Sequence, residues 1–199
     1  MIVKLIDYNK NLLETVKLAT SKCYDSISSE KAVDHCAVCG HWSVLEHCWF
    51  SFEVSGVSRA LLAQITRHRH LSFSVRSQRY CDEGNMDYVL PDIKDLNLRQ
   101  AYKTALAVVT DVYEELVKSG IPKENARYIL PNAKHTTFVV SGNGRAWLEF
   151  LLKRLCYRAQ WEIRELAEKI HTLLMEKIPE IFQYADPCVE CMEGGCPKE

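Results

Sequence analysis

Cationic side chains are concentrated in one short stretch of this sequence. Residues 67–80, RHRHLSFSVRSQRY, contain four arginines, two histidines and three serines. Guanidinium groups bind phosphates through paired hydrogen bonds, and hydroxyl and backbone N–H groups complete such sites. Phe73 and Tyr80 supply rings that can stack on a planar base. The stretch therefore predicts a site for a nucleotide or another phosphate ligand; the alternative is a solvated arginine-rich face near a helix end.

The overall composition requires this anion recognition to be local. The chain has 25 Lys and Arg against 26 Asp and Glu, a formal net charge of −1, so it lacks the broad basic charge of many nucleic-acid-binding proteins. Its 47% of hydrophobic residues can bury a sizeable core. No apolar run approaches the ~20 residues of a membrane span, and the first residues lack a signal-peptide pattern. We therefore expect a cytoplasmic protein with no nucleic-acid or membrane partner.

Periodicity in the sequence predicts the elements that position the cationic stretch. Alternating apolar residues predict strands over residues 1–8, 49–54 and 135–143. Helical spacing predicts helices over residues 11–19, 58–69, 96–120 and 121–131, and a long last helix, with or without a break, over residues 144–178. Residues 21–40 are predicted to be mostly loop with one short helix, and residues 81–96 to be loop. These elements indicate one α+β domain over residues 1–199, with a mixed sheet packed against long helices and a cysteine-bearing tail from about residue 186.

Several helix boundaries carry their own signals. Ser58 can cap the helix predicted over residues 58–69, whereas Gly120 and Pro122 mark the end of one helix and the first turn of the next. Gln64 and Arg67 are three residues apart and would share a helix face. The cationic stretch is therefore expected to run from a helix end into a loop.

The cationic stretch also resembles a known family. Arg67-His68-Arg69, followed after seven residues by Ser77, resembles the motif of the flavin-dependent thymidylate synthases, the ThyX family. Further blocks similar to that family occur in the same order along the chain: GHWSVLEH at 40–47, SRALLAQITRHR at 58–69, SQRY at 77–80, ARYILP at 126–131, Asn143, and RAQWEIR at 158–164 with Arg154 one helical turn earlier. Ordered blocks over most of the chain are more specific than any one motif.

The resemblance implies an activity, a set of cofactors and an assembly. Members of the family convert dUMP to dTMP, with 5,10-methylenetetrahydrofolate as carbon donor, FAD as redox carrier and a reduced nicotinamide, usually NADPH, as electron source. Their fold is α+β, and they are homotetramers whose active sites are built from several subunits. The same is expected of this chain.

The resemblance also implies roles for individual residues. Arg154 is expected to act in catalysis, against the edge of the uracil ring. The residues expected to bind FAD are His41, Ser43, Arg67, His68, Arg69, Val75, Asn143 and Arg145. Those expected to bind dUMP are Gln64, Arg67, Val75, Ser77, Gln78, Arg79, Arg127 and Arg154.

The sequence departs from the family pattern at two places. The commonest form of the motif has Asn-Glu where this chain has Ser74 and Val75. The contacts that those two side chains make with flavin and nucleotide are therefore not expected here, whereas contacts made by the backbone can be kept. The family often has asparagine at the position of Glu149, and no role is carried over to that residue. Ser77 is expected to bind phosphate rather than to act as a nucleophile, because a serine nucleophile needs an adjacent base and its neighbours are mainly arginines.

Cysteines offer a second kind of chemistry. Cys36 and Cys39 form one C-x-x-C pair and Cys188 and Cys191 another, each with the spacing of half a zinc site, and Cys196 follows. The pairs are far apart in sequence, and nine cysteines cannot all pair within one chain. We expect free thiols in a reducing compartment and no metal. A zinc-stabilised scaffold and a nucleic-acid-binding module are the alternatives to the enzyme.

Overall fold

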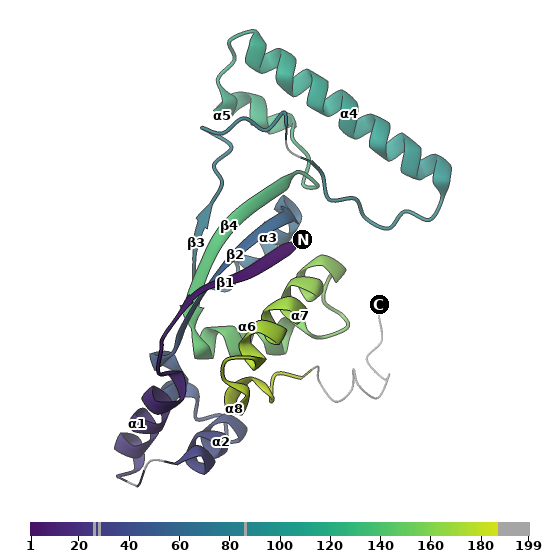
Figure 1. Ribbon diagram of the computed structural model, residues 1–199. Helices are drawn as coiled ribbons and strands as arrows, with labels where there is room; N and C mark the ends of the chain where they lie inside the picture. Colours follow the sequence, from purple (N-terminus) through teal and green to yellow (C-terminus); the bar gives the residue numbers. More distant parts are fainter. Residues whose placement is uncertain (26, 28, 86, 187–199) are drawn as a thin grey trace.

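A computed structural model describes residues 1–25, 27, 29–85 and 87–186 of the chain (Figure 1). Among the described residues helices outnumber strands: three helices follow the last strand, and the others lie between strands along the chain. In chain order the elements are β1 Ile2–Tyr8, α1 Leu12–Tyr24, α2 Glu30–Val38, the 3₁₀ helix η1 Trp42–His47, β2 Trp49–Ser58, α3 Arg59–Ile65, β3 Leu71–Val75, α4 Leu96–Lys118, α5 Lys123–Ala126, the 3₁₀ helix η2 Arg127–Ile129, β4 His135–Asn143, α6 Gly144–Arg154, α7 Trp161–Met175 and α8 Pro179–Phe182.

The four strands form one sheet in the order β1-β2-β4-β3. β2 and β4 are its long central strands, and β3 pairs with β4 from Leu71 opposite Gly142 to Val75 opposite Phe138. All three pairings are antiparallel, so the prediction of a mixed sheet is wrong. The α+β class itself is confirmed.

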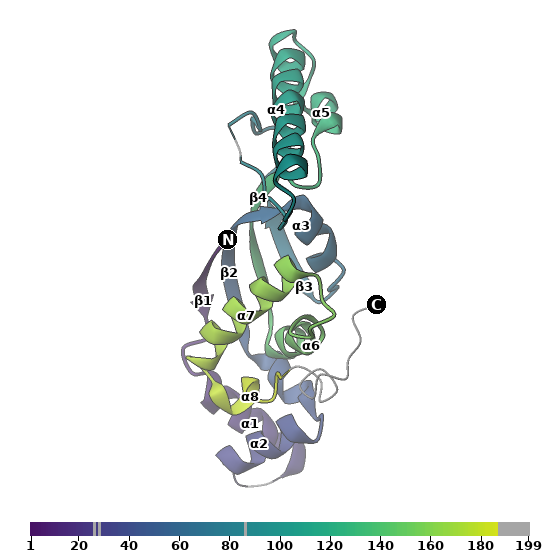
Figure 2. The ribbon, with the colours of Figure 1, turned by 90° about the vertical axis from the view of Figure 1, so that its right-hand side faces the viewer.

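Apolar side chains alternate along the strands because successive residues of a strand point to opposite faces. Phe50, Phe52 and Val54 of β2 are fully buried, while the residues between them are partly exposed. α6 and α7 cover the buried face (Figure 2). Trp147 of α6 packs edge-on against Phe52, with ring centroids 4.9 Å apart. The hydrophobic core therefore lies between one face of the sheet and these two helices.

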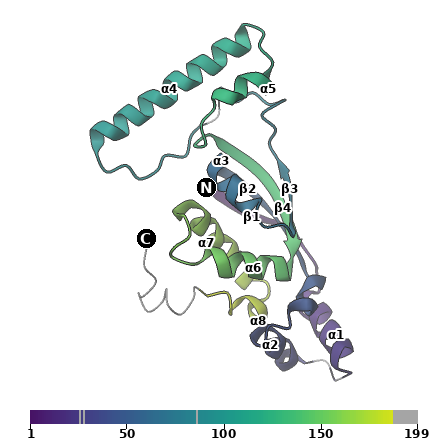
Figure 3. The same ribbon diagram turned by 180° about the vertical axis from the view of Figure 1, so that it is seen from behind.

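Helices lie beyond both ends of the sheet (Figures 1 and 3). α1, α2 and α8 lie at one end, and α4 with α5 forms an arm at the other. Only Leu106 and Tyr113 of the 23-residue α4 are buried. No helix in the described ranges is both long enough and apolar enough to cross a membrane.

Two sequence predictions about local structure are wrong. Residues 21–40 are mostly helical: α1 continues to Tyr24, and α2 is a nine-residue helix capped by Ser29. The cationic stretch contains the strand β3 where only a helix end and a loop were expected. The last helix was predicted over residues 144–178 with or without a break, and the structure has the break: residues 155–160 separate α6 from α7.

Candidate functional site

The arginine-histidine triplet lies in a turn between α3 and β3. Ser58 caps α3 as predicted, with its hydroxyl accepting a hydrogen bond from the Leu61 amide at 3.0 Å. α3 ends at Ile65, so Gln64 is helical and Arg67 lies beyond the helix. The predicted shared helix face of these two residues is therefore absent.

Arg67, His68 and Arg69 line a cleft of about 340 Å³ together with residues of α6. Lys153 and Arg154 supply the cationic wall from α6. The remaining lining residues are His70, Leu71, Ala146 and Glu149. Four cationic side chains against a single carboxylate make this cleft suited to an anion.

His68 and Arg154, which both line this cleft, are joined by a hydrogen bond. The Arg154 Nε donates a hydrogen bond to His68 Nε2 at 3.1 Å, and its Nη2 donates to the Gln64 carbonyl at 3.5 Å. Burial, followed by the charges of Arg154 and Lys153, lowers the pKa of His68 to about 4. His68 is therefore neutral at physiological pH, and its unprotonated Nε2 can hold the guanidinium in place.

A second hollow of about 290 Å³ adjoins the cleft. It is lined by Glu46, His70, Asn143, Arg145, Ala146 and Glu149, three of which also line the first cleft. Asn143 caps α6, because its Oδ1 accepts from the Ala146 amide at 2.8 Å. Arg145 forms ion pairs with Glu46 at 2.8 Å and with Glu149 at 3.0 Å. Two of the residues expected to bind FAD thus lie beside the triplet, and one of them is held by two carboxylates.

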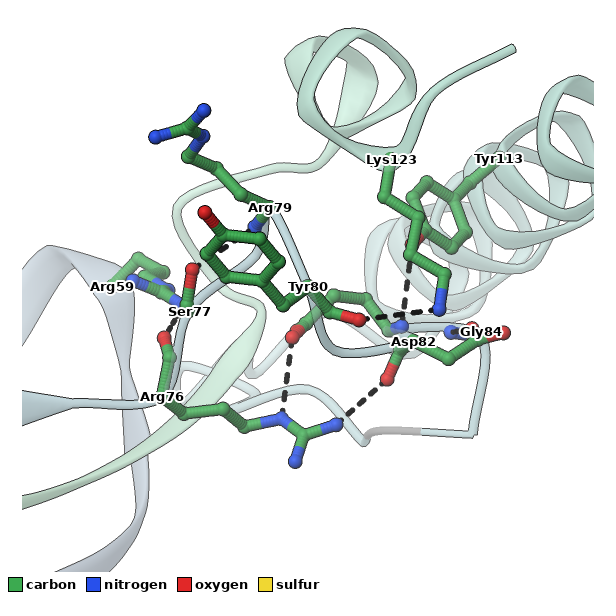
Figure 4. A network of polar contacts seen from close by, with 10 residues as sticks. Arg59, Arg76, Ser77, Arg79, Tyr80, Asp82, Gly84, Tyr113 and Lys123 are labelled. Atoms are coloured by element: carbon green, nitrogen blue, oxygen red, sulfur yellow. Dashed lines mark hydrogen bonds and ion pairs between the residues drawn. The ribbon is translucent and has the colours of Figure 1, made fainter. Parts of the chain in front are cut away.

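The other expected phosphate ligands gather at the opposite end of β3 (Figure 4). Ser77 Oγ accepts from the Arg79 amide at 3.2 Å, which closes a tight turn. The Arg79 guanidinium pairs with Glu124 of α5 at 2.9 Å, and Arg127 Nε donates to the Glu124 carbonyl at 3.1 Å. Arg79 and Arg127 therefore both contact Glu124, one through its carboxylate and the other through its carbonyl, and Ser77 lies in the turn beside Arg79.

Within one chain, these two groups of residues do not meet. The triplet precedes β3 and the Ser77–Arg79 turn follows it. The five residues of β3 make four steps of about 3.3 Å, so the strand alone separates the two groups by roughly 13 Å. Arg154 lies with the first group and Arg79 with the second.

Four further site residues have different surroundings. His41 Nδ1 is hydrogen-bonded to the Tyr24 hydroxyl near the end of α1. Ser43 lines a separate, largely apolar cavity of about 460 Å³ with residues of α1. Val75 packs against the hydrophobic core, so it can offer a ligand only its backbone. Gln78 is half-buried in the turn that contains Ser77.

Sequence reasoning did not assign several charged residues at these two places. Glu149 and Lys153 line the first cleft, Glu46 pairs with Arg145, and Glu124 pairs with Arg79. Glu149 follows Arg145 by four residues on α6, a spacing that places both on one helix face. Glu124 had no comparable local signal, because it lies 45 residues from Arg79.

The first cysteine pair remains as two thiols. Cys36 is buried, and exposed Cys39 has its sulfur 3.6 Å from His35 Nδ1. Among the residues that the structure describes, no three His, Cys, Asp or Glu side chains are arranged to hold a metal ion. Cys188, Cys191 and Cys196 lie outside the described residues, so the prediction of no metal stays a prediction.

The chain matches a known family over most of its length. Residues 4–180 fit the model of the family described as "Thymidylate synthase complementing protein". The chain belongs to this family. Its relatives carry the name flavin-dependent thymidylate synthase. One from Geobacter sulfurreducens is 36% identical, with 100% of this chain and 91% of the relative aligned. Those from Pyrococcus furiosus and Clostridium tetani are 36% and 32% identical, with 98% of this chain aligned to 89% and 90% of the relative, respectively.

Membership of the flavin-dependent thymidylate synthase family confirms the resemblance seen in the sequence. The matched region contains both ends of β3, including the Arg67–Arg69 triplet and the Ser77–Arg79 turn. Both groups of cationic side chains therefore lie within the region that matches the family model.

Proposed function

We propose that the protein is a flavin-dependent thymidylate synthase that methylates dUMP to dTMP, with 5,10-methylenetetrahydrofolate as carbon donor and NADPH as reductant. The observation that carries this proposal is the cationic cleft formed by the Arg67–Arg69 triplet and Arg154, in a chain of this family. The free thiols of Cys36 and Cys39 favour a reducing compartment, and we place the enzyme in the cytoplasm.

The residues of the cleft fit the anionic part of FAD. Arg67, Arg69 and Lys153 provide cationic donors for a diphosphate, and the adjoining hollow with Asn143 and Arg145 extends the space beside them. His41 and Ser43 would have to reach the same cofactor from another part of the assembly. FAD, when bound, supplies the redox chemistry, while the protein binds, orients and shields the reactants.

Arg154 is the residue that we assign to the chemical step. It cannot act as a general base, because a guanidinium stays protonated at working pH. It can stabilise negative charge on the uracil ring at N3 and O4, which makes C5 more nucleophilic. His68 and Gln64 hold it from behind through the two hydrogen bonds described above.

The 5′-phosphate of dUMP fits the far end of β3. Ser77, Gln78 and Arg79 form a turn with a hydroxyl, backbone amides and a guanidinium, and Arg127 adds a second guanidinium nearby. A phosphate would take the place that the Glu124 carboxylate now holds on Arg79. Ser77 is a binding residue in this scheme, so Ser77→Ala should keep measurable turnover.

In a homotetramer with shared active sites, the residues at the two ends of β3 can serve one nucleotide, because they come from different subunits. Within one chain, the length of β3, roughly 13 Å, lies between the group that contains Arg154 and the turn that contains Arg79. If Arg154, Arg67 and Gln64 come from one subunit and the Ser77–Arg79 turn from another, the uracil and phosphate ends are served together. The separation within the chain supports this arrangement.

The test separates flavin binding from nucleotide binding. Arg67→Ala and Arg69→Ala should weaken FAD binding, followed by flavin absorbance and fluorescence, without loss of fold. Arg79→Ala should weaken dUMP at least about tenfold, because a charged hydrogen bond contributes roughly 1.5–3 kcal/mol. Anaerobic turnover of dUMP with NADPH, the folate donor and added FAD measures the activity. Wild-type FAD affinity in both triplet variants, or equal affinity of the wild type for dUMP and deoxyuridine, would refute these assignments.

A further inference from the structure

The turn that carries Ser77 and Arg79 is fastened to the rest of the molecule through the preceding residue, Arg76. The Arg76 amide donates to the Thr137 carbonyl of β4 at 3.0 Å, and the Arg76 carbonyl accepts from Arg59 Nη2 of α3 at 2.8 Å. The first residue after β3 is therefore fixed from two sides by its backbone.

The Arg76 side chain closes the loop that follows. Its Nε donates to Glu83 Oε1 at 3.2 Å, and its Nη2 donates to the Asp82 carbonyl at 2.8 Å (Figure 4). The guanidinium of Arg76 thus links the start of the segment 77–81 to Asp82 and Glu83, which follow it. The guanidinium is directed away from that of Arg79, so it braces the loop from behind.

Glu83 supplies the charge that this brace requires. Its side chain is fully buried, and its pairing with Arg76, 28% exposed, takes place in a region of low dielectric. Glu83 also interacts electrostatically with Arg59 and Lys134. Burial lowers the pKa of both cations, and the negative charge of Glu83 opposes that shift. The Glu83 amide donates to the Tyr113 hydroxyl at 3.3 Å, which connects the loop to α4. Glu83 is therefore a counter-charge for Arg76 after β3, for Arg59 of α3 and for Lys134 just before β4.

Contacts with α5 complete the support of the turn. Lys123 Nζ donates to the Tyr80 carbonyl at 3.3 Å, and the Cys81 amide donates to the Ser77 carbonyl at 3.0 Å. The Ser77 hydroxyl and the backbone amides next to it are consequently held in one arrangement before any ligand arrives. A loop ordered in advance binds an anion without losing conformational entropy at that moment.

We propose that Arg76, through its ion pair with Glu83, is a positioning residue that pre-forms the phosphate-binding turn at Ser77–Arg79. Arg76 itself does not touch the substrate. This inference rests on the proposed function, which assigns the 5′-phosphate of dUMP to that turn.

The experiment compares affinity for dUMP with affinity for deoxyuridine, which lacks the phosphate. Calorimetric titration of the FAD-loaded protein is done with wild type, Arg76→Met, Arg76→Lys and Arg79→Ala. Arg76→Met should weaken dUMP about tenfold or more and leave deoxyuridine within about twofold, as the loss of one charged hydrogen-bonding group would do. Arg76→Lys should restore part of the affinity, since it keeps the charge opposite Glu83 and loses the fork.

Arg164→Met is the matched control. Arg164 of α7 is 25% exposed, pairs with Glu168 and donates to the Tyr157 carbonyl, so it has the same kinds of partners as Arg76 but none in the turn. It should leave the preference for dUMP over deoxyuridine unchanged. The thermal midpoint and bound flavin of every variant are measured in parallel, because a purely structural role of Arg76 would lower the affinity for both nucleotides together with flavin.

The outcomes distinguish this inference from the proposed function. If the wild type prefers dUMP, Arg79→Ala removes that preference and Arg76→Met keeps it, the positioning role is wrong and the phosphate site stands. A parallel loss of dUMP, deoxyuridine and flavin binding in Arg76→Met would also overturn the positioning role. If neither the wild type nor any variant distinguishes the two nucleotides, the phosphate assignment itself fails.

Discussion

Arg154→Lys is the substitution that tests the chemical role of the cleft most directly. Lysine keeps the positive charge but replaces a planar fork with one ammonium group. In the wild type the fork donates at once to His68 Nε2 and to the Gln64 carbonyl, at 3.1 and 3.5 Å. A lysine cannot keep both of these bonds and also face the uracil edge.

The expected loss follows from the hydrogen bonds given up. A hydrogen bond to a charged group contributes roughly 1.5–3 kcal/mol, which corresponds to about a 10- to 150-fold change in rate if it is lost in the transition state. Arg154 is only partly exposed, so solvent does not replace the lost partner fully. FAD affinity should fall less, because Arg67, Arg69 and Lys153 remain in place.

Single-turnover kinetics separates these effects. Pre-reduced enzyme is mixed anaerobically with dUMP and 5,10-methylenetetrahydrofolate, and dTMP formation is followed by rapid quench. Arg99→Lys, a change of the same type at an exposed residue of α4, is the control and should react like the wild type. If Arg154→Lys forms dTMP at the wild-type rate, Arg154 has no part in the chemistry and the reasoning is refuted.

Three further changes have outcomes that the structure determines. The pKa of His68 is lowered to about 4 from an ordinary 6.5, so the unfolded chain takes up this proton first as the pH falls. Stability should be independent of His68 above pH 6.5 and should fall between pH 6.5 and about 4. Thermal melts of His68→Gln should show a shallower loss of stability over that range. Glu124→Gln releases Arg79 from an exposed ion pair worth ~0–1 kcal/mol and should tighten dUMP by up to about fivefold in calorimetry, and weaker binding would contradict the competition. Gly144→Ala would place Cβ 2.9 Å from the Leu45 carbonyl oxygen and should lower stability by about 1–3 kcal/mol in urea titrations, whereas an unchanged midpoint would mean that the backbone yields without strain.

Much of the fold could be predicted from local patterns. The alternation of Phe50, Phe52 and Val54 identifies β2, and Ser58 and Gly120 mark helix ends that the structure confirms, the glycine with a φ of 85°. These signals succeed because each depends on residues close together in the chain. β3 was missed although Leu71, Phe73 and Val75 alternate with serines, since five residues at a sheet edge give a weak signal beside so many arginines.

The arrangement of the site was less predictable. The residues around Arg67 and Arg154 were identified from blocks of the sequence, and the structure brings them together in one cleft. The separation of Arg79 from that cleft depends on the length and pairing of β3, which no local pattern encodes. The pairing of Arg79 with Glu124 depends on how the arm returns to the sheet. Contacts between distant segments are a property of the packed chain.

The arm formed by α4 and α5 has a consequence for how the molecule opens. A 23-residue helix with two buried side chains has few apolar contacts to lose, whereas β2 and β4 lie in the core. Local unfolding free energies follow such differences, so in the isolated chain amide protons of α4 should exchange with solvent long before those of the central strands. The Tyr113 hydroxyl accepts a hydrogen bond from the Glu83 amide and so joins this helix to the loop after β3. A ligand bound at the Ser77 turn would therefore slow amide exchange in α4, a helix that contacts no substrate. The local opening equilibrium of the arm would then depend on whether the ligand is bound.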